Sequence, residues 1–276
     1  MKEKNLAIPK KNSEDTIAIL ILNSEIRMAQ FSFWAVALWG WCLSAQAAEV
    51  SVAVAANFAA PMQKIAQAFE QATGHKAVLS FGATGNLYAQ IRNGAPFQVL
   101  LAADDETPRR LEKEGLGVAG TRFTYAFGKL VLWSRQAGVV DDQGEVLRSG
   151  KFQRIAIANP KLSPYGAAAI ETLTTMNLLA AVRPKWVQGE NISQVYQFVA
   201  SENAQLGFVA LSQISPGGKS VQGSVWVVPE GDYQPIQQDA LLLVQGQQAP
   251  AAVALMRYLR SDQAKVLVRS FGYGLP

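Results

Sequence analysis

From residue 48 onward, short apolar runs alternate with stretches in which apolar residues recur at helical spacing. Strands are expected over the runs at residues 50–56, 76–81, 99–103, 129–133, 154–158 and 206–210. Between the first two runs, Met62, Ile65 and Phe69 lie three or four positions apart, as on one face of a helix. This alternation predicts an α/β architecture with mainly parallel, doubly wound sheets.

Two long extended stretches interrupt the alternation, at residues 122–134 and 224–244. We interpret them as the two crossover strands on which the chain passes into a second lobe and returns. The predicted first lobe therefore begins with residues 48–127, the second covers 128–228, and residues 229–276 return to the first. The helix expected at 250–260 would pack on the first lobe.

The segment before residue 48 has the features of an export signal. Residues 31–44 form an uncharged apolar run that is short for a membrane span, and Ala45-Gln46-Ala47 follows as a cleavage pattern. We therefore expect residues 1–47 to be a signal peptide, with residues 1–27 a possible mis-assigned extension. An uncleaved membrane anchor is the alternative.

Composition narrows the class of protein. The 276 residues are 49% hydrophobic and 17% charged, with a net charge of +4, as in a well-packed globular protein. The chain shows no basic stripe, so nucleic acid is not an expected partner. The single cysteine, Cys42, lies in the apolar run and is lost on cleavage, which removes disulfides and thiolate metal sites from consideration.

Residues suited to catalysis are few. His75 is the only histidine and falls at an expected helix-to-strand turn, where a solvated side chain is the ordinary interpretation. Asp104, Asp105 and Glu106 form one acidic cluster, but Thr107-Pro108 follows as the expected N-cap and first residue of a helix. The prediction is that the protein is not an enzyme. An exported hydrolase or transferase using these residues is the less favoured alternative.

Uncharged hydrogen-bond donors are better represented, at expected helix starts after strands. Four segments have this form: Ala56-Asn57, Gly82-Ala83-Thr84-Gly85, Pro164-Tyr165-Gly166 and Asn191-Ile192-Ser193. At such ends the first N–H groups lack partners within the helix and carry the positive end of its dipole. Each segment alone could be an ordinary helix cap. Together, at the ends of strands in two lobes, they predict a shared anion site.

The absence of Lys and Arg from these segments bears on the ligand. A lysine attracts any anion, whereas fixed neutral dipoles reward one size and geometry. A fully deprotonated oxyanion only accepts hydrogen bonds, so a cage built only of donors suits it.

At these segments the chain resembles the molybdate-binding proteins of molybdate ABC transporters, in the variant with a second-lobe tyrosine. The motifs are VAVAANF, GATGNLYAQIRNGAPFQVLLAADD, RFTYAFGKLVLWS, IAIANPKLSPYG, ASENAQLGFVALSQI and FGYGLP. The resemblance implies a two-lobe, type II periplasmic-binding-protein fold that closes on molybdate or tungstate without a metal–protein bond. No further cofactor is implied.

The resemblance also implies a set of ligand-binding residues. Ala56 and Asn57 supply donors from the first helix start, and Thr84 supplies its hydroxyl and backbone N–H. Tyr165 supplies a phenol hydroxyl from the second lobe, and Ile192 a backbone N–H. Many relatives have Ser or Thr at the position of Ala56, and others bind with a tyrosine where this chain has Ala210.

The resulting expectation is a monomeric periplasmic receptor that closes on one oxyanion and delivers it to an inner-membrane ABC permease. Receptors for sulfate, phosphate or an organic anion on the same fold remain alternatives, because the sequence does not measure the cavity.

Overall fold

The computed structural model describes residues 47–215 and 221–276 of the chain. The predicted signal peptide lies, except for its last residue, outside the described residues. Within the part of the chain that is described, no helix has the length and apolar character needed to cross a membrane.

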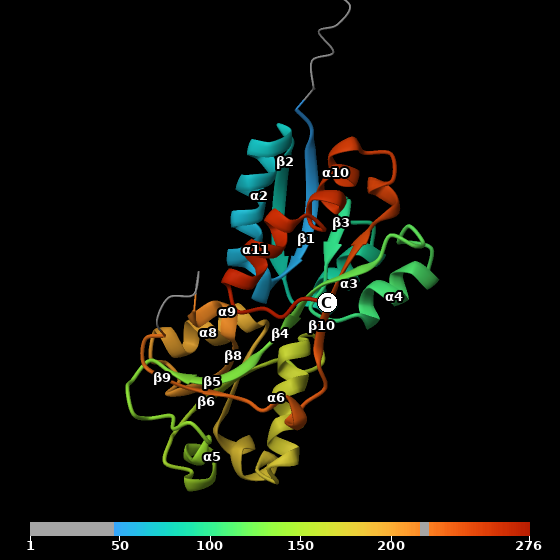
Figure 1. The fold of residues 1–276 in the computed structure, drawn as a ribbon. Helices are drawn as coiled ribbons and strands as arrows, with labels where there is room; N and C mark the ends of the chain where they lie inside the picture. Colours follow the sequence, from blue (N-terminus) through green and yellow to red (C-terminus); the bar gives the residue numbers. More distant parts are fainter. Residues whose placement is uncertain (1–46, 216–220) are drawn as a thin grey trace, which may run out of the picture. The chain divides into compact units, whose positions relative to one another are not determined.

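The first sheet has the strand order β2-β1-β3-β10-β4. Its strands are β1 (Glu49–Ala55), β2 (Lys76–Gly82), β3 (Val99–Leu101), β4 (Phe123–Gly128) and β10 (Ile236–Leu242). β1 pairs in parallel with β2 and β3, while β10 runs antiparallel to β3 and β4. The parallel strands all point their carboxyl ends toward the second lobe (Figure 1).

The second sheet repeats this plan in the order β7-β6-β8-β5-β9. Its strands are β5 (Leu130–Ser134), β6 (Ile155–Ala158), β7 (Trp186–Gly189), β8 (Leu206–Ala210) and β9 (Ser224–Val227). β6 pairs in parallel with β7 and β8, and β5 runs antiparallel to β8 and β9. The two-lobe α/β fold predicted from the sequence is confirmed.

Both sheets are mixed, but in each of them four of the five strands point the same way, in agreement with the predicted mainly parallel sheets. The chain leaves the first sheet at β4, enters the second at β5 after Lys129 alone, and returns from β9 to β10. These crossing strands run antiparallel to their neighbours. Helical spacing between strands identifies βαβ units, but it carries no information on the direction of a strand that joins two sheets.

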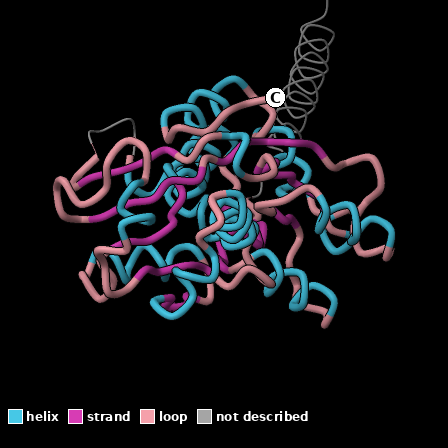
Figure 2. Tube along the Cα trace, turned by 90° about the horizontal axis from the view of Figure 1, so that it is seen from below, coloured by secondary structure: helices cyan, strands magenta, loops and turns pink. Residues whose placement is uncertain are grey.

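Helices lie on both sides of the strands (Figure 2). The first lobe contains the short helix η1 (Ala56–Phe58), α2 (Ala59–Thr73), α3 (Thr84–Arg92), α4 (Glu106–Lys113), α10 (Pro250–Tyr258) and α11 (Asp262–Ser270). The second contains α5 (Glu145–Ser149), α6 (Pro164–Thr175), α7 (Leu179–Val182), α8 (Ile192–Ala200) and α9 (Leu211–Ile214). α2 ends at Gly74, whose φ of 72° is a left-handed conformation that glycine adopts without strain.

Each lobe has its own apolar core. One cluster joins strands β1, β3, β4 and β10 with α2, α10 and α11, and includes Phe58, Phe69 and Leu255. A second cluster fills the other lobe around β5, β6 and β8 and includes Leu132 and Phe208. The C-terminal helices α10 and α11 therefore pack on the first lobe.

The start of α4 differs from the prediction. Thr107 is not the N-cap and Pro108 is not the first residue, because the helix begins at Glu106. Asp105 is the N-cap residue, and the carboxylate of Asp104 just before it accepts the Thr107 backbone N–H at 2.8 Å and the Thr107 hydroxyl at 3.1 Å.

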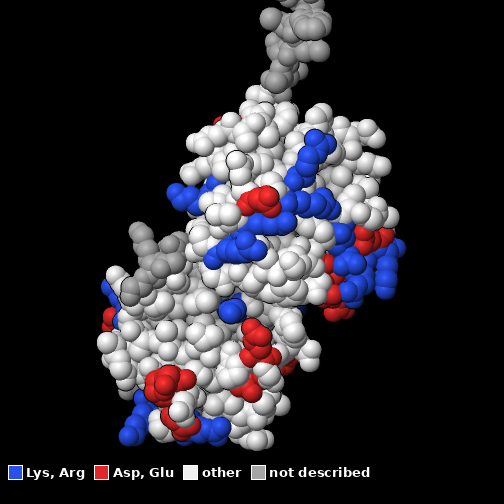
Figure 3. Space-filling model, in the orientation of Figure 1, with Lys and Arg blue, Asp and Glu red and all other residues white. Residues whose placement is uncertain are grey.

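Basic and acidic side chains are interspersed on the face drawn in Figure 3, with large uncharged areas between them.

Candidate functional site

A small cavity lies where helix starts of the two lobes meet. β1 and β2 of the first lobe, and β6 and β7 of the second, each lead into a helix at their carboxyl ends. The cavity is lined by Ala55, Ala56, Asn57, Gly82, Ala83, Thr84, Ala103, Ser163, Pro164, Asn191 and Ile192. Each of the four segments singled out in the sequence therefore contributes at least one residue to this cavity.

The structure brings together four of the five residues predicted to bind the ligand. Ala56, Asn57, Thr84 and Ile192 line the cavity, while Tyr165 does not. The anion-binding role of these residues stays a prediction, but the common cavity that it requires is present.

The lining is uncharged and the space is small. No Lys, Arg, His, Asp or Glu is among the lining residues. The cavity has a volume of about 10 Å³, roughly the space of one water molecule and far below the roughly 300–1,000 Å³ that holds a drug-sized organic molecule. The chemistry of its lining suits a ligand that accepts hydrogen bonds from neutral donors.

Thr84, the first residue of α3, offers two donors. Its hydroxyl oxygen accepts the backbone N–H of Ala103 at 3.0 Å, which fixes the oxygen and leaves the hydroxyl proton for another acceptor. Its own N–H has no partner within the helix because of its position in the first turn.

Ile192 begins α8, and its neighbours determine what it can offer. The side chain of Asn191 accepts the N–H groups of Ser193 at 2.9 Å and Gln194 at 3.1 Å. Asn191 is thus the N-cap of α8, which is the ordinary capping role that the sequence also allowed for this segment. The cap uses the second and third N–H groups of the helix, so the N–H of Ile192 is the donor at this end that can face a ligand.

The side-chain amide of Asn57 is not free to donate to a ligand. Both amide hydrogens are engaged within the protein: Nδ2 donates to Gln238 Oε1 at 2.9 Å and to the Tyr273 hydroxyl at 3.0 Å. The Asn57 carbonyl accepts from Tyr273 at 2.8 Å and from Ser212 at 3.1 Å. These bonds hold the η1 backbone in place, so the donors that Ala56 and Asn57 can present are their backbone N–H groups.

Tyr165 points toward the crossing strands. Its hydroxyl accepts Gln238 Nε2 at 3.2 Å, and the side chain is 1% exposed. Burial raises the pKa of Tyr165 well above its usual value, so the phenol keeps its proton at neutral pH. In this closed arrangement, the phenol contacts the residue that holds Asn57.

Ser163 is a cavity residue that the sequence interpretation missed. It is the N-cap of α6 and 5% exposed, yet its side chain accepts no N–H from that helix. A hydroxyl that does not cap its helix is available to the cavity that it lines. The signal was present, since Ser before Pro is a typical helix start, but attention fell on the adjacent Pro164-Tyr165-Gly166 segment.

The lobes are closed around the cavity by direct hydrogen bonds. The Ser193 hydroxyl of the second lobe donates to the Ala56 carbonyl of the first at 3.2 Å. On another side, the Gly85 N–H donates to the Leu162 carbonyl at 2.9 Å. Both bonds involve residues of the helix-start segments that line the cavity, or residues next to them, so lobe closure takes place beside the cavity.

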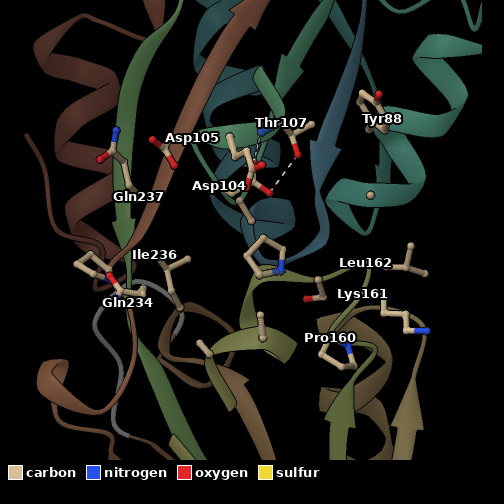
Figure 4. A pocket seen from close by; sticks show the side chains of 18 of the residues that line it. Tyr88, Asp104, Asp105, Thr107, Pro160, Lys161, Leu162, Gln234, Ile236 and Gln237 are labelled. Atoms are coloured by element: carbon tan, nitrogen blue, oxygen red, sulfur yellow. Dashed lines mark hydrogen bonds between the residues drawn. The ribbon is translucent and has the colours of Figure 1, made fainter. Parts of the chain in front are cut away.

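A larger groove of about 630 Å³ opens beside the cavity (Figure 4) and shares Ala103, Ser163 and Pro164 with it. Its charged lining residues are Asp104, Asp105, Glu106, Arg110, Lys161 and Glu171. Four carboxylates against two cations disfavour a dianion there by simple Coulomb repulsion. The small cavity is therefore the better anion site, although the groove is larger.

Asp104 lines this groove, and its partial burial changes its pKa. Desolvation raises its pKa from 3.8 to about 6, against the lowering effect of the two hydrogen bonds from Thr107 (Figure 4). The carboxylate serves the start of α4, and the neighbouring Asp105 pairs with Arg109. The acidic cluster thus has the helix-start role expected of it.

The remaining candidate for catalysis lies away from the cavity. His75 precedes β2, at the end of that strand opposite Gly82, and its Nδ1 accepts the Ala48 N–H at 3.3 Å. Among the residues that the structure describes, no group of three or more His, Cys, Asp or Glu side chains is arranged to hold a metal ion.

Two α/β lobes, joined by two strands and closed on an uncharged cavity, define a receptor of the solute-binding class. The chain belongs to the family of bacterial extracellular solute-binding proteins, whose model matches residues 50–274.

The chain is similar to proteins named for molybdate binding. The molybdate-binding protein ModA of Azotobacter vinelandii is 58% identical over 84% of this chain and 92% of its own. ModA of Rhodobacter capsulatus is 47% identical over 85% of this chain and 91% of its own. The structure of an Azotobacter vinelandii periplasmic molybdate-binding protein matches with a TM-score of 0.79 and 39% identity, over 82% of this chain and 99% of that one.

Proposed function

We propose that this protein is the substrate-binding component of an ABC importer and captures molybdate or tungstate in the cavity between its lobes. The observation that carries the proposal is the lining of that cavity, in which uncharged helix starts of both lobes meet with no charged side chain. The names and high identity of the two ModA relatives support molybdate as the ligand.

The ligand is held by its oxygens. The hydroxyl and N–H of Thr84, the backbone N–H groups of Ala56 and Asn57, and the N–H of Ile192 donate to it, with Ser163 as a further hydroxyl. Such fixed donors need no reorganisation on binding, and in an enclosed site each counts for more than in water. No bond forms between metal and protein, and no cofactor takes part.

Tyr165 remains a proposed contributor from the second lobe. Its protonated phenol can donate, and a small hinge rotation about the two crossing strands would alter how near it comes to the ligand. A double-mutant cycle of Tyr165→Phe and Gln238→Met distinguishes direct contact with the ligand from an effect through Gln238.

Binding is coupled to transport through closure. The ligand contacts helix starts from both lobes only when they meet, so its binding free energy favours the closed form. A membrane permease that recognises the closed form then receives only loaded receptor. The protein acts as a periplasmic monomer exported by a cleaved signal peptide, and its role is capture rather than catalysis.

The proposal is tested by calorimetry on the exported protein with molybdate, tungstate, sulfate and phosphate. Molybdate and tungstate are expected to bind at one site per chain, with sulfate and phosphate at least a hundredfold weaker, since a smaller oxyanion leaves every hydrogen bond too long. Heat with sulfate alone would assign a sulfate receptor, and heat with none of the four would overturn the anion function.

An Asp104→Asn variant separates the receptor from a hydrolase or transferase. A receptor keeps its oxyanion affinity within about threefold, because Asp104 lies outside the cavity lining. A large loss of affinity would instead place the acidic cluster in the site.

A further inference from the structure

We infer that Gln238 is the positioning residue of the binding site: it holds Asn57 at the cavity and, through Tyr165, joins the two lobes when they close. The inference rests on the proposed function, and it concerns a residue that does not line the cavity. Gln238 lies on β10, the strand by which the chain returns to the first lobe, and its side chain is fully buried.

The amide of Gln238 has two sides that face different lobes. On the first-lobe side, Oε1 accepts Asn57 Nδ2 at 2.9 Å and the Tyr125 hydroxyl at 3.0 Å. On the other side, Nε2 donates to Tyr165 in the first turn of α6 at 3.2 Å. One neutral side chain therefore joins a cavity residue of one lobe to a helix start of the other.

The backbone around Gln238 is shaped for this arrangement. The pairing of β10 with β4 shifts register between Gln238 and Asp239, an irregularity that redirects side chains. Across the pair, β4 ends at Gly128, where an added Cβ would overlap the Tyr165 hydroxyl and lie 2.6 Å from Gln238 Nε2. Gly128 thus leaves the space in which the two side chains meet.

The same bonds fix what Asn57 presents to a ligand. With one amide hydrogen on Gln238 and the other on Tyr273, the Asn57 side chain has a single orientation. The η1 backbone, whose N–H groups face the cavity in our proposal, is then set before the ligand arrives. Loss of the Gln238 contact would leave the Asn57 side chain held by Tyr273 alone and would also remove an interlobe bond.

The neighbouring Gln237 provides a matched control. It faces the groove (Figure 4), and its Nε2 donates to Thr124 Oγ1 at 3.0 Å and to Asp239 Oδ1 at 3.3 Å. Gln237→Met removes a glutamine from the same strand and breaks two side-chain bonds, but it leaves Asn57 and Tyr165 untouched.

The test compares Gln238→Met and Gln237→Met by molybdate calorimetry, stopped-flow dissociation and thermal unfolding without ligand. We expect Gln238→Met to raise Kd at least tenfold, mainly through faster dissociation, and Gln237→Met to change Kd less than twofold. A purely structural role would lower the ligand-free Tm of Gln238→Met and leave the Kd of the folded protein unchanged, which would overturn the inference.

A double-mutant cycle with Tyr165→Phe tests the route of the effect. If Gln238 acts through Tyr165, the phenylalanine change adds less than twofold to Kd in the Gln238→Met background, although it weakens the wild type. Fully multiplicative effects would break the proposed link between the two. Should Gln238→Met not fold, Tyr165→Phe alone takes its place, because it removes the acceptor of Gln238 Nε2 and leaves the bond between Gln238 and Asn57 intact.

These outcomes also separate the two proposals. Wild-type protein that binds molybdate while Gln238→Met binds equally well overturns the positioning role alone. Wild-type protein that binds none of the four anions overturns the proposed function, and the role of Gln238 with it.

Discussion

The hydroxyl of Thr84 accepts the backbone N–H of Ala103 at 3.0 Å, and both residues line the cavity. This bond joins the start of α3 to the segment after β3. The Thr84 hydroxyl oxygen satisfies the buried Ala103 N–H, and its proton remains free to donate to a ligand. A threonine at this point therefore serves stability and ligand binding together.

Replacing Thr84 by valine should lower both the stability of the protein and its affinity for the ligand. The variant keeps the shape but leaves the Ala103 N–H unpaired, which costs about 1–3 kcal/mol of unfolding free energy. The lost hydrogen bond to a charged ligand costs about 1.5–3 kcal/mol of binding, or roughly 10- to 100-fold in Kd. Thr84→Ser should restore most of each, as measured by thermal unfolding and calorimetry. Unchanged affinity in the valine variant would remove the side chain from the site.

Ser163 and Ser261 form a pair for separating ligand binding from helix capping. Ser261 caps α11, where its hydroxyl accepts the Ala264 N–H at 3.3 Å, whereas Ser163 caps no N–H of α6. Ser163→Ala should weaken oxyanion binding about tenfold with little change in stability. Ser261→Ala should lower stability by about 1 kcal/mol with unchanged affinity. The reverse pattern in calorimetry and thermal unfolding would show that Ser163 is only structural.

The elements that position the site could be predicted because their signals are local. Apolar runs identified the strands, Gly74 marked the end of α2, and Asn191 marked the start of α8. In an open α/β fold the carboxyl ends of parallel strands gather at one edge, so helix starts found separately in the sequence were expected to meet. The cavity that Asn57, Thr84 and Ile192 share follows from that rule.

The direction of side chains within the site could not be predicted, because it depends on distant contacts. The Asn57 amide is held by Gln238, which is 181 residues away in the sequence. Tyr165 points into the space left by Gly128, and nothing near Tyr165 in the chain indicates it. Motifs therefore located the residues, while tertiary packing decided whether a side chain or a backbone group faces the cavity.

The raised pKa of Asp104 should appear in the pH dependence of stability. Between about pH 4 and pH 6 the folded protein holds a proton that the unfolded chain has released, so stability falls as pH rises through this range. A shift from 3.8 to about 6 corresponds to about 3 kcal/mol. Asp104→Asn removes this titration and keeps an oxygen for Thr107. Between pH 4 and pH 7 the unfolding free energy of the wild type should therefore fall by about 3 kcal/mol more than that of Asp104→Asn. An equal change in the two proteins would contradict the raised pKa of Asp104.

Gly85 allows closure to be tested apart from folding. It lies in the first turn of α3 and donates its N–H to Leu162 of the second lobe, and an added Cβ would lie 3.1 Å from Leu162 Cα and Cδ2. Gly85→Ala therefore crowds the closed form while leaving the separate lobes unstrained, since alanine suits a helix better than glycine. We expect an unchanged or higher ligand-free Tm together with about tenfold weaker molybdate binding.

The control for this change is Gly231→Ala, because a Cβ at Gly231 meets no atom within 4 Å. Small-angle scattering with saturating molybdate adds the decisive observation. The Gly85→Ala protein should be less compact than wild type in the bound state, since the contact that it disturbs exists only where the lobes meet, and the Gly231→Ala protein should match wild type. Weaker binding with full compaction would show that Gly85 does not act through closure.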